Sequence, residues 1–300
     1  MFTSDLFLPA ATRLAFALTG GLSMIVLAER HHLREFTRRT LFLRWRTWAI
    51  SAPLFGAAAM GHLAFAVVFV MALALQGMRE YAALVELPDR YRLALYAAGL
   101  ASIPIAITSL TFWRALPPIL LIAATLTPLL MQDIEEGVKR LAFTGLGFAY
   151  VPWLLTYVLL IREHTTEGSG ILLALGMAVA LSDVFAFVFG SAFGRHPLAR
   201  RLSPGKTVEG VAGNVVGAYA GFALMAFALP PGLNPVIKWL LPSVIALACV
   251  WGDLVESLIK RQFGAKDAGS WLPGFGGLLD RIDSLLFACP LVYTVVVLGG

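Results

Sequence analysis

The chain has 300 residues, of which 59% are hydrophobic and only 14% are charged, and its formal net charge is +5. Soluble domains carry about 25% charged residues, and a water-soluble fold has too little interior to bury so much apolar side chain. The composition therefore excludes a soluble enzyme or binding module and predicts an integral membrane protein.

The positive charge is typical of the loops and headgroup contacts of a membrane protein, so we expect no nucleic-acid partner. The two cysteines, Cys249 and Cys289, lie in apolar segments. We expect them to be small core residues and not a disulfide or a metal site. The N-terminus lacks a charged segment followed by a small-residue cleavage site, so we do not expect a removable signal peptide.

Apolar stretches of about 17–25 residues recur along the chain, and a helix of this length crosses a bilayer. The alternation of apolar and polar residues that marks a membrane β-barrel is not seen. We therefore predict an all-α, polytopic membrane protein of nine to ten transmembrane helices, nine if the second and third spans form one broken element. The predicted spans are 10–28, 47–60, 62–80, 92–112, 115–131, 141–161, 170–190, 208–229, 237–259 and 284–299.

Basic residues gather in the odd-numbered loops between these spans, and Arg114 and Arg162 are exceptions in the even-numbered ones. Loops rich in Lys and Arg stay in the cytoplasm. The pattern predicts cytoplasmic odd-numbered loops and both termini outside, in what we expect to be a bacterial inner membrane. The first loop is the most basic, and contact with an anionic lipid leaflet explains its arginines as well as a bound ligand does: Arg30, Arg34, Arg38, Arg39, Arg44 and Arg46.

We interpret residues 1–140 as an N-terminal transmembrane region and residues 141–300 as a C-terminal catalytic region, the two forming one integrated membrane fold. Two polar loops, 191–207 and 260–283, interrupt the second region. Both fall on the predicted cytoplasmic side, where a water-soluble nucleotide could reach them.

In the first of these loops Ser203 precedes Pro204, which predicts a helix start with Ser203 as its N-cap and Lys206 in its first turn. Free N–H groups and the dipole make such a helix end a phosphate site. The loop is not a Walker A sequence, because that pattern needs glycine where Arg200 stands. A capped helix with a lysine at the membrane interface is the alternative interpretation.

The stretch from Gly252 to Ser284 gathers an unusual number of charges for so apolar a chain. Its carboxylates are Asp253, Glu256, Asp267, Asp280 and Asp283, and its basic residues are Lys260, Arg261, Lys266 and Arg281. Asp253, Glu256, Ser257 and Lys260 share one narrow face of a predicted helix. That face must meet protein or water, because exposing it to lipid would be costly.

Asp280 and Asp283 share a helical face at the start of the last span, after a glycine-rich turn at 273–277 that allows positive φ and close backbone approach. Carboxylates from two helix ends with basic residues among them are typical of a site for Mg²⁺ and phosphates. Neutralisation of these charges by each other is the alternative. Asp183 is ionisable within a span and is therefore a further candidate, which Glu209 and Asn214 could approach.

Three runs of sequence resemble the phosphatidate cytidylyltransferases, also called CDP-diacylglycerol synthases. They are SD at 182–183, SPGKTVEG at 203–210, and the long run from 252 to 283 with KDAG at 266–269, PGFGG at 273–277 and LLDRID at 278–283. The specific likeness covers about residues 170–290. Over the N-terminal half it is one of hydropathy and layout, and the RWRTW run at 44–48 is similar to a paralogous branch.

The resemblance implies an enzyme that joins CTP to phosphatidate, giving CDP-diacylglycerol and pyrophosphate, with Mg²⁺ and room for a second cation. It also implies membrane lipids as partners and a homodimer. Asp253 and Asp280 are expected as the main metal ligands, with Asp183 and Asp283 as additional ligands or partners of the ligands. Lys260 and Lys266 complete the expected catalytic set. The residues expected to hold phosphates or donate hydrogen bonds to the substrates are Ser203, Lys206, Ser257, Lys260, Arg261, Lys266 and Arg281.

One position departs from the family pattern, because Phe275 stands where the family usually has His in PGHGG. The departure leaves two other hypotheses open. The chain could be a cytidylyltransferase for another lipid phosphate, or a non-catalytic, regulatory paralogue. A transporter is a further alternative, which inverted repeats would favour, and we find none.

Overall fold

A computed structural model of the chain describes residues 4–28, 40–269, 271 and 276–299. Helices make up nearly all of the described part, and a two-stranded hairpin interrupts them. The helices are α1 (Ser4–Ala28), α2 (Thr40–Met60), α3 (Leu63–Leu84), α4 (Asp89–Thr108), α5 (Leu110–Ala124), α6 (Leu126–Met131), α7 (Gly137–Phe148), η2 (Ala149–Trp153), α8 (Leu154–His164), α9 (Gly168–Phe193), α10 (Val208–Leu224), η3 (Ala226–Ala228), α11 (Pro235–Gln262) and α12 (Leu279–Gly299). The strands are β1 (Pro197–Ala199) and β2 (Ser203–Thr207).

The predicted all-α, polytopic membrane fold is confirmed. Eight helical segments of the described residues are long and apolar enough to cross a membrane, and α10 is a shorter apolar helix. Each predicted span coincides with a helical segment, although several ends move: α2 begins at Thr40, and α11 continues to Gln262. Both cysteines are free and buried, as expected.

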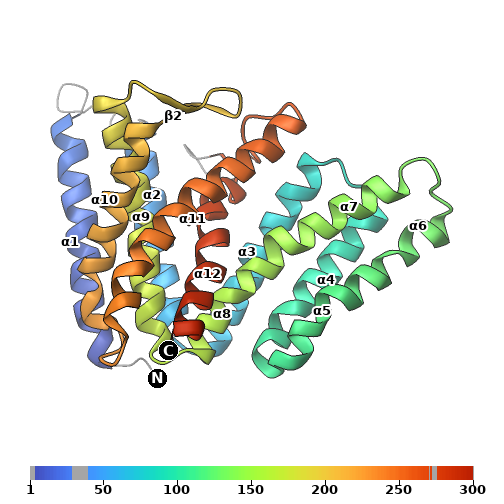
Figure 1. Cartoon of the computed structure of the whole chain (residues 1–300), viewed down its shortest axis with the longest axis horizontal. Helices are drawn as coiled ribbons and strands as arrows, with labels where there is room; N and C mark the ends of the chain where they lie inside the picture. The colour runs from blue at the N-terminus through green and yellow to red at the C-terminus, as the bar shows by residue number, and fades with distance from the viewer. Residues whose placement is uncertain (1–3, 29–39, 270, 272–275, 300) are drawn as a thin grey trace.

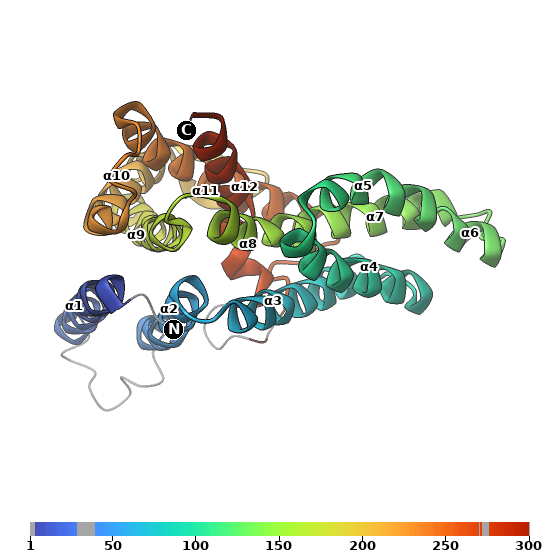
Figure 2. The ribbon, with the colours of Figure 1, turned by 90° about the horizontal axis from the view of Figure 1, so that it is seen from below.

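The helices stand in two rows that are visible from below (Figure 2). Helices α1 to α4 follow one another along one row, and α10, α9, α11, α12, α8, α5 and α7 form the other. Helices α4 to α7 lean away from the rest as an arm on the right of Figure 1. One large hydrophobic core runs through both rows, from Ala10 to Val292. The predicted regions 1–140 and 141–300 therefore share a core, and the boundary at residue 140 stays an interpretation.

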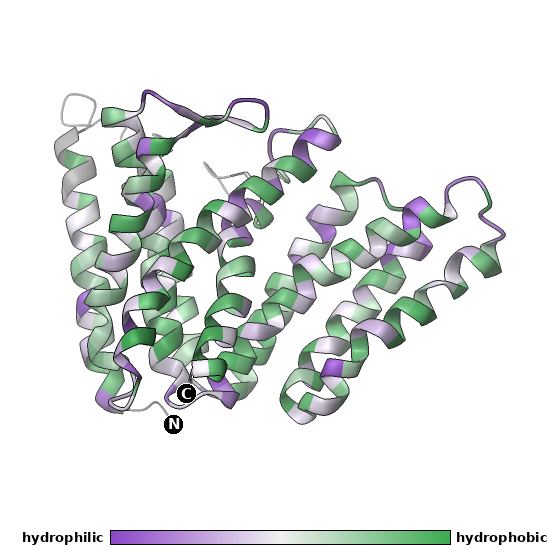
Figure 3. Ribbon diagram, in the orientation of Figure 1, coloured by the Kyte–Doolittle hydropathy of each residue, from purple (hydrophilic) through white to green (hydrophobic). Residues whose placement is uncertain are grey.

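Polar residues concentrate at the ends of the bundle, whereas the middle is apolar (Figure 3). The end that carries the β1–β2 hairpin also carries the α3–α4, α6–α7 and α11–α12 connections (Figure 1). These are odd-numbered loops, so the basic loops that the structure describes after residue 40 lie together at one end of the molecule. Arg114, Arg162 and Lys238 belong to helix ends on the opposite side.

The segment from Gly137 to His164 is one continuous helical segment whose hydrogen-bond pattern changes in the middle. A five-residue π-helix, η2, separates α7 from α8 and contains Pro152. Proline has no N–H to donate, and short π-helical insertions are frequent at functional sites. The insertion places Tyr150 in the buried interior, with 4% of its surface exposed.

Helices α9 and α10 pack unusually closely along a row of glycines on α10. A Cβ added at Gly217 would lie 2.3 Å from the carbonyl oxygen of Leu181, and one at Gly221 would lie 2.4 Å from that of Met177. Small residues let helix backbones approach closely in membranes, where packing replaces the hydrophobic effect as the driving force. This contact holds the part of α9 that carries Asp183 beside the middle of α10, between Gly213 and Gly217.

The predicted helix start at Ser203 is wrong. Ser203–Thr207 is strand β2, which pairs antiparallel with β1, Ala199 opposite Ser203. Helix α10 begins at Val208, and the N-cap is Thr207, whose hydroxyl accepts the N–H of Gly210 at 3.1 Å. Proline is tolerated in a two-stranded edge, so Ser-Pro did not mark a helix here.

The close contact between α9 and α10 leads to a prediction about stability. Gly217→Ala should lower the stability of the folded protein by about 1–3 kcal/mol, because the new methyl group must push two backbones apart. Thermal unfolding in detergent measures the change. Gly145→Ala is the matched control, since a Cβ there meets nothing within 4 Å. Equal melting temperatures for the two variants would contradict the packing argument.

Candidate functional site

The charged residues of the C-terminal half meet where the end of α11 and the start of α12 cross, beneath the β1–β2 hairpin. The crossing is close, because a Cβ added at Gly252 would lie 2.4 Å from the carbonyl oxygen of Asp283. Two neighbouring groups of charges result. We call them the Lys206 cluster (Lys206, Asp253, Asp283 and Asp183) and the Lys260 cluster (Lys260, Glu256 and Asp280).

The Lys206 cluster joins strand β2 to three helices. Lys206 forms an ion pair with Asp253 on α11, and their side chains are 27% and 34% exposed. The carboxyl groups of Asp253 and Asp283 are in hydrogen-bond contact across the α11–α12 crossing. Asp183 on α9 lies near enough to Asp253 and Lys206 for their charges to interact. Asp253 therefore interacts with each of the other three residues of the cluster.

The Lys260 cluster is more deeply buried. The Nζ atom of Lys260 lies 2.6 Å from Glu256 Oε2, one turn earlier on α11, and 2.6 Å from Asp280 Oδ1 on α12. The side chains of Lys260, Glu256 and Asp280 are 12%, 4% and 3% exposed. The predicted helical face of Asp253, Glu256 and Lys260 is thus present, and it turns toward α12.

Asp280 also organises the connection between the two helices. Its Oδ2 atom accepts the N–H of Gly277 at 2.7 Å and that of Ala268 at 3.0 Å. A Cβ at Gly276, where φ is +87°, would lie 2.7 Å from the same oxygen. Asp280 therefore already has three donors, from Lys260 and two backbone N–H groups, and holds both ends of the connecting loop.

Negative charge exceeds positive charge in the two clusters. Two lysines face five carboxyl groups, and Arg281, exposed on α12, interacts electrostatically with Asp183 and Asp253. Buried polar groups nearly always find a partner, yet Tyr150 Oη and Glu256 Oε1 are buried here with no hydrogen-bond partner among the described residues. These oxygens and the excess charge suit a cation or a bound polar ligand.

The donors fit a metal ion that arrives with phosphates better than a permanently held ion. Among the described residues no group of three or more His, Cys, Asp or Glu side chains forms a complete metal cage. Mg²⁺ usually takes one or two protein carboxylates and fills its other positions with water and phosphate oxygens. The touching pair Asp253–Asp283 supplies that number.

The remaining predicted residues lie around these clusters. Arg261 donates to the carbonyl oxygens of Leu202, at 3.2 Å, and Ala265, and so ties the hairpin to the end of α11. Lys266 is exposed in the loop after α11, whereas Ser203 and Ser257 are half-buried. Phe275, the departure from the motif, lies outside the described residues.

One of the two polar residues expected near Asp183 lies elsewhere. Glu209 does not turn toward Asp183. Its carboxylate accepts the backbone N–H groups of Arg195 and His196 and lies 2.6 Å from His196 Nδ1, which fixes the hairpin to α10. Asn214 is buried with its side-chain oxygen unpaired.

Comparison of the sequence with known proteins shows its family. The sequence model of the cytidylyltransferase family matches residues 42–298. The chain belongs to the cytidylyltransferase family. That match includes the N-terminal half as well as both clusters.

Several bacterial proteins named phosphatidate cytidylyltransferase are similar to the chain. One from Mycobacterium leprae is 41% identical over 150 residues, which is 50% of this chain and 47% of that protein. One from Staphylococcus haemolyticus is 35% identical over 168 residues, 55% of this chain and 60% of that protein. One from Staphylococcus aureus is 34% identical over 166 residues, with the same coverage. The matched segments thus span about half to three fifths of these relatives.

Glu80 is a residue of the site that was not predicted from the sequence. This α3 residue is only 6% exposed, and its carboxylate accepts the backbone N–H groups of Leu278 and Leu279 at 2.9 and 2.8 Å. An acidic residue near the end of an apolar span was the available signal. Its partners are backbone groups, which no side-chain pattern reveals.

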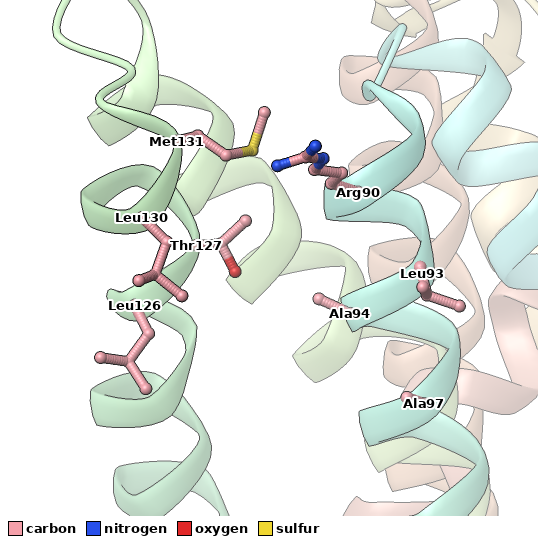
Figure 4. Close-up of a pocket in the computed structure, with 8 residues that line it drawn as sticks. All are labelled: Arg90, Leu93, Ala94, Ala97, Leu126, Thr127, Leu130 and Met131. Carbon is pink, nitrogen blue, oxygen red and sulfur yellow. The ribbon is translucent and has the colours of Figure 1, made fainter.

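A cleft of about 460 Å³ lies elsewhere, between α4 and α6. Figure 4 shows Arg90 and Met131 reaching into the gap from its two sides, with Thr127 and Ala94 facing each other below them. It holds no carboxylate and opens on the apolar flank of the arm, so we place the site at the two charge clusters and not in this cleft.

The burial of the Lys260 cluster also leads to a prediction about stability. Lys260→Met should destabilise the protein by about 3–5 kcal/mol, because it leaves two buried carboxylates without their partner. Thermal unfolding in detergent measures this. Lys139→Met is the control, since Lys139 pairs with Glu136 while 61% exposed, and such surface pairs add little. A Lys260 variant as stable as the control would contradict the proposed burial of charge.

Proposed function

We propose that the protein is a membrane-bound nucleotidyltransferase that joins CTP to phosphatidate, giving CDP-diacylglycerol and pyrophosphate. The observation that carries the proposal is the pair of lysine–carboxylate clusters at one polar end of an apolar bundle. Family membership and relatives named phosphatidate cytidylyltransferase support the same reaction. A site at the membrane surface suits a reaction between a lipid and a water-soluble nucleotide.

The reaction depends more on stabilising negative charge on the phosphates than on proton transfer. A phosphate oxygen of the lipid attacks the α-phosphorus of CTP, and pyrophosphate leaves. The second pKa of a phosphate monoester is about 6, so this nucleophile is already an anion near pH 7. The protein must instead bring two anions together, hold them in line and stabilise the leaving pyrophosphate.

The two lysines are placed to hold phosphates. Lys206 comes from the hairpin and Lys260 from α11, so phosphates between them would meet positive charge from two sides. Arg281, Arg261 and Lys266 surround the entrance with further positive charge. Ser203 and Ser257 remain the proposed hydrogen-bond donors to substrate.

The proposed metal ligands are Asp253 and Asp283, with Asp183 beside them. Bound there together with CTP, Mg²⁺ would offset the repulsion between phosphates and stabilise developing negative charge. Asp280 remains a proposed ligand, but its oxygens are already engaged by Lys260, Ala268 and Gly277. It would have to release one of these donors to bind metal. A second cation could neutralise Glu256.

The location of the reaction is part of the proposal. The described basic loops, those after α3, α6, α9 and α11, gather at the end of the bundle that carries both clusters, and basic loops favour the cytoplasm. CTP would therefore enter from the cytoplasm of a bacterial cell, while the lipid phosphate would enter from the surrounding leaflet. A homodimer is proposed from the family resemblance alone.

A non-catalytic paralogue is the rival hypothesis, and the buried carboxyl groups speak against it. Unpaired charge in a membrane protein is expensive to keep. A protein that bound neither metal nor phosphates would gain nothing from five carboxyl groups around two lysines. We therefore retain the catalytic function as the proposal.

Purified protein with labelled CTP, Mg²⁺ and phosphatidate should form CDP-diacylglycerol. Asp253→Asn should lower the rate by at least about 100-fold, because it removes charge that the transition state needs. Asp280→Asn should also lower the rate, because it weakens the ion pair with Lys260 and the hydrogen bonds to the loop N–H groups of Ala268 and Gly277. Glu135→Gln, an exposed change in the α6–α7 connection, is the control. Folded protein that makes no product from any lipid phosphate would refute the proposal.

Phe275→His should change kcat by less than about tenfold in the same assay. A general base typically contributes 10²–10⁴-fold. This reaction needs none, because the attacking lipid phosphate is already an anion near pH 7. A rise of 100-fold or more in the His variant would show that a proton acceptor is missing from the native chain.

A further inference from the structure

The start of α12 lacks a side-chain cap of its own. Ile282 donates its N–H to the carbonyl oxygen of Leu278 at 3.2 Å, so Leu278 is the N-cap residue. Leucine has no oxygen with which to accept the free N–H groups of a helix start, whereas Ser, Thr, Asp and Asn do. A buried helix start without such a partner would be costly.

Glu80 of α3 supplies that partner from the other half of the chain. Its Oε1 atom accepts the N–H of Leu278 at 2.9 Å, and its Oε2 atom accepts that of Leu279 at 2.8 Å. Gln76, one turn earlier on α3, donates to Oε1 at 3.0 Å and fixes the carboxylate. Charge-assisted hydrogen bonds of this kind are stronger than neutral ones.

The loop before α12 is shaped around this carboxylate. A Cβ added at Gly277 would lie 2.5 Å from Oε2 of Glu80, and one at Gly269 would lie 3.0 Å from its Oε1. Two glycines of the sequence motif therefore leave room for Glu80. Asp280 binds the adjacent N–H groups, those of Gly277 and Ala268.

We propose that Glu80 is a positioning residue for the site: by capping α12 from α3, it holds Asp280 against Lys260 and Asp283 against Asp253. The two acids lie in the first turns of α12, so any displacement of its start moves both clusters. The inference rests on the proposed function, because it names what sets the geometry of that site. It also gives the N-terminal region a role in the chemistry.

The test compares Glu80→Gln with Glu86→Gln, which removes the same charge from an exposed residue in the α3–α4 connection. Glutamine keeps the shape of Glu80 but replaces one acceptor oxygen with a donor. Hydrogen exchange of the purified protein, read by mass spectrometry, should be about fivefold faster at the amides of Leu278 and Leu279. Exchange in α9 should not change.

Turnover and binding separate positioning from simple stabilisation. In Glu80→Gln, kcat should fall by about 10–100-fold, since small misplacements of catalytic groups have effects of this size. The KM for phosphatidate should change little, whereas Mg²⁺-dependent binding of CTP, measured by calorimetry without lipid, should weaken. Glu80→Asp keeps the charge with a shorter reach and should give a smaller loss in each measurement.

Two results would overturn the inference. One is unchanged exchange at Leu278 and Leu279 in the folded Glu80 variants. The other is faster exchange there with native kcat and native CTP binding, which would make Glu80 a stabilising cap only. If the native protein makes no product, the proposed function fails, while the exchange and CTP-binding comparison still decides the role of Glu80.

Discussion

Charge buried in a membrane protein must be paired, and this constraint shapes the whole C-terminal half. Lys206 of the hairpin pairs with Asp253 on α11, and Lys260 pairs with Glu256 on α11 and Asp280 on α12. The hydrocarbon around the bundle offers no water to these groups, so the charges can be held only where helix ends meet a polar surface. The remaining helices bring those ends together and keep lipid away from them.

Close helix contacts make that arrangement possible. Gly252 lets α11 cross α12 at Asp283, and Gly217 lets α10 lie directly on α9. At each glycine an added side chain would meet a backbone carbonyl oxygen of the neighbouring helix. It would therefore push α12, which carries Asp283, or α9, which carries Asp183, away from its neighbour. Glu80 extends the same dependence to α3, since its carboxylate replaces the missing cap of α12.

Much of this could be predicted from the sequence, for physical reasons. Spans follow from apolar length, and the shared face of Asp253, Glu256 and Lys260 follows from the helical period. The hairpin at Ser203–Thr207 could not be predicted, because Ser before Pro is a signal of both helix starts and irregular edges. Glu80 escaped because its partners are backbone N–H groups 198 and 199 residues away.

The division of the charges into two clusters also lay beyond the sequence. The spacing and the family resemblance together made Asp253 and Asp280 equal candidates for the main metal ligands. In the structure both clusters hold a pair of carboxyl groups in contact, Asp253 with Asp283 and Asp280 with Glu256. Asp280 is also bound by Lys260 and two loop N–H groups, whereas Asp253 pairs with Lys206 alone among the lysines of the two clusters. The Asp253–Asp283 pair is therefore the more available to a divalent cation.

The most direct test of this account is the position of a metal ion. Anomalous diffraction from crystals grown with Mn²⁺ and CTP locates it without any assay of activity. The account predicts a peak in contact with Asp253 and Asp283 and with phosphate oxygens of the nucleotide. A nucleotide bound with its metal away from both residues, for example on exposed Asp267, would contradict it.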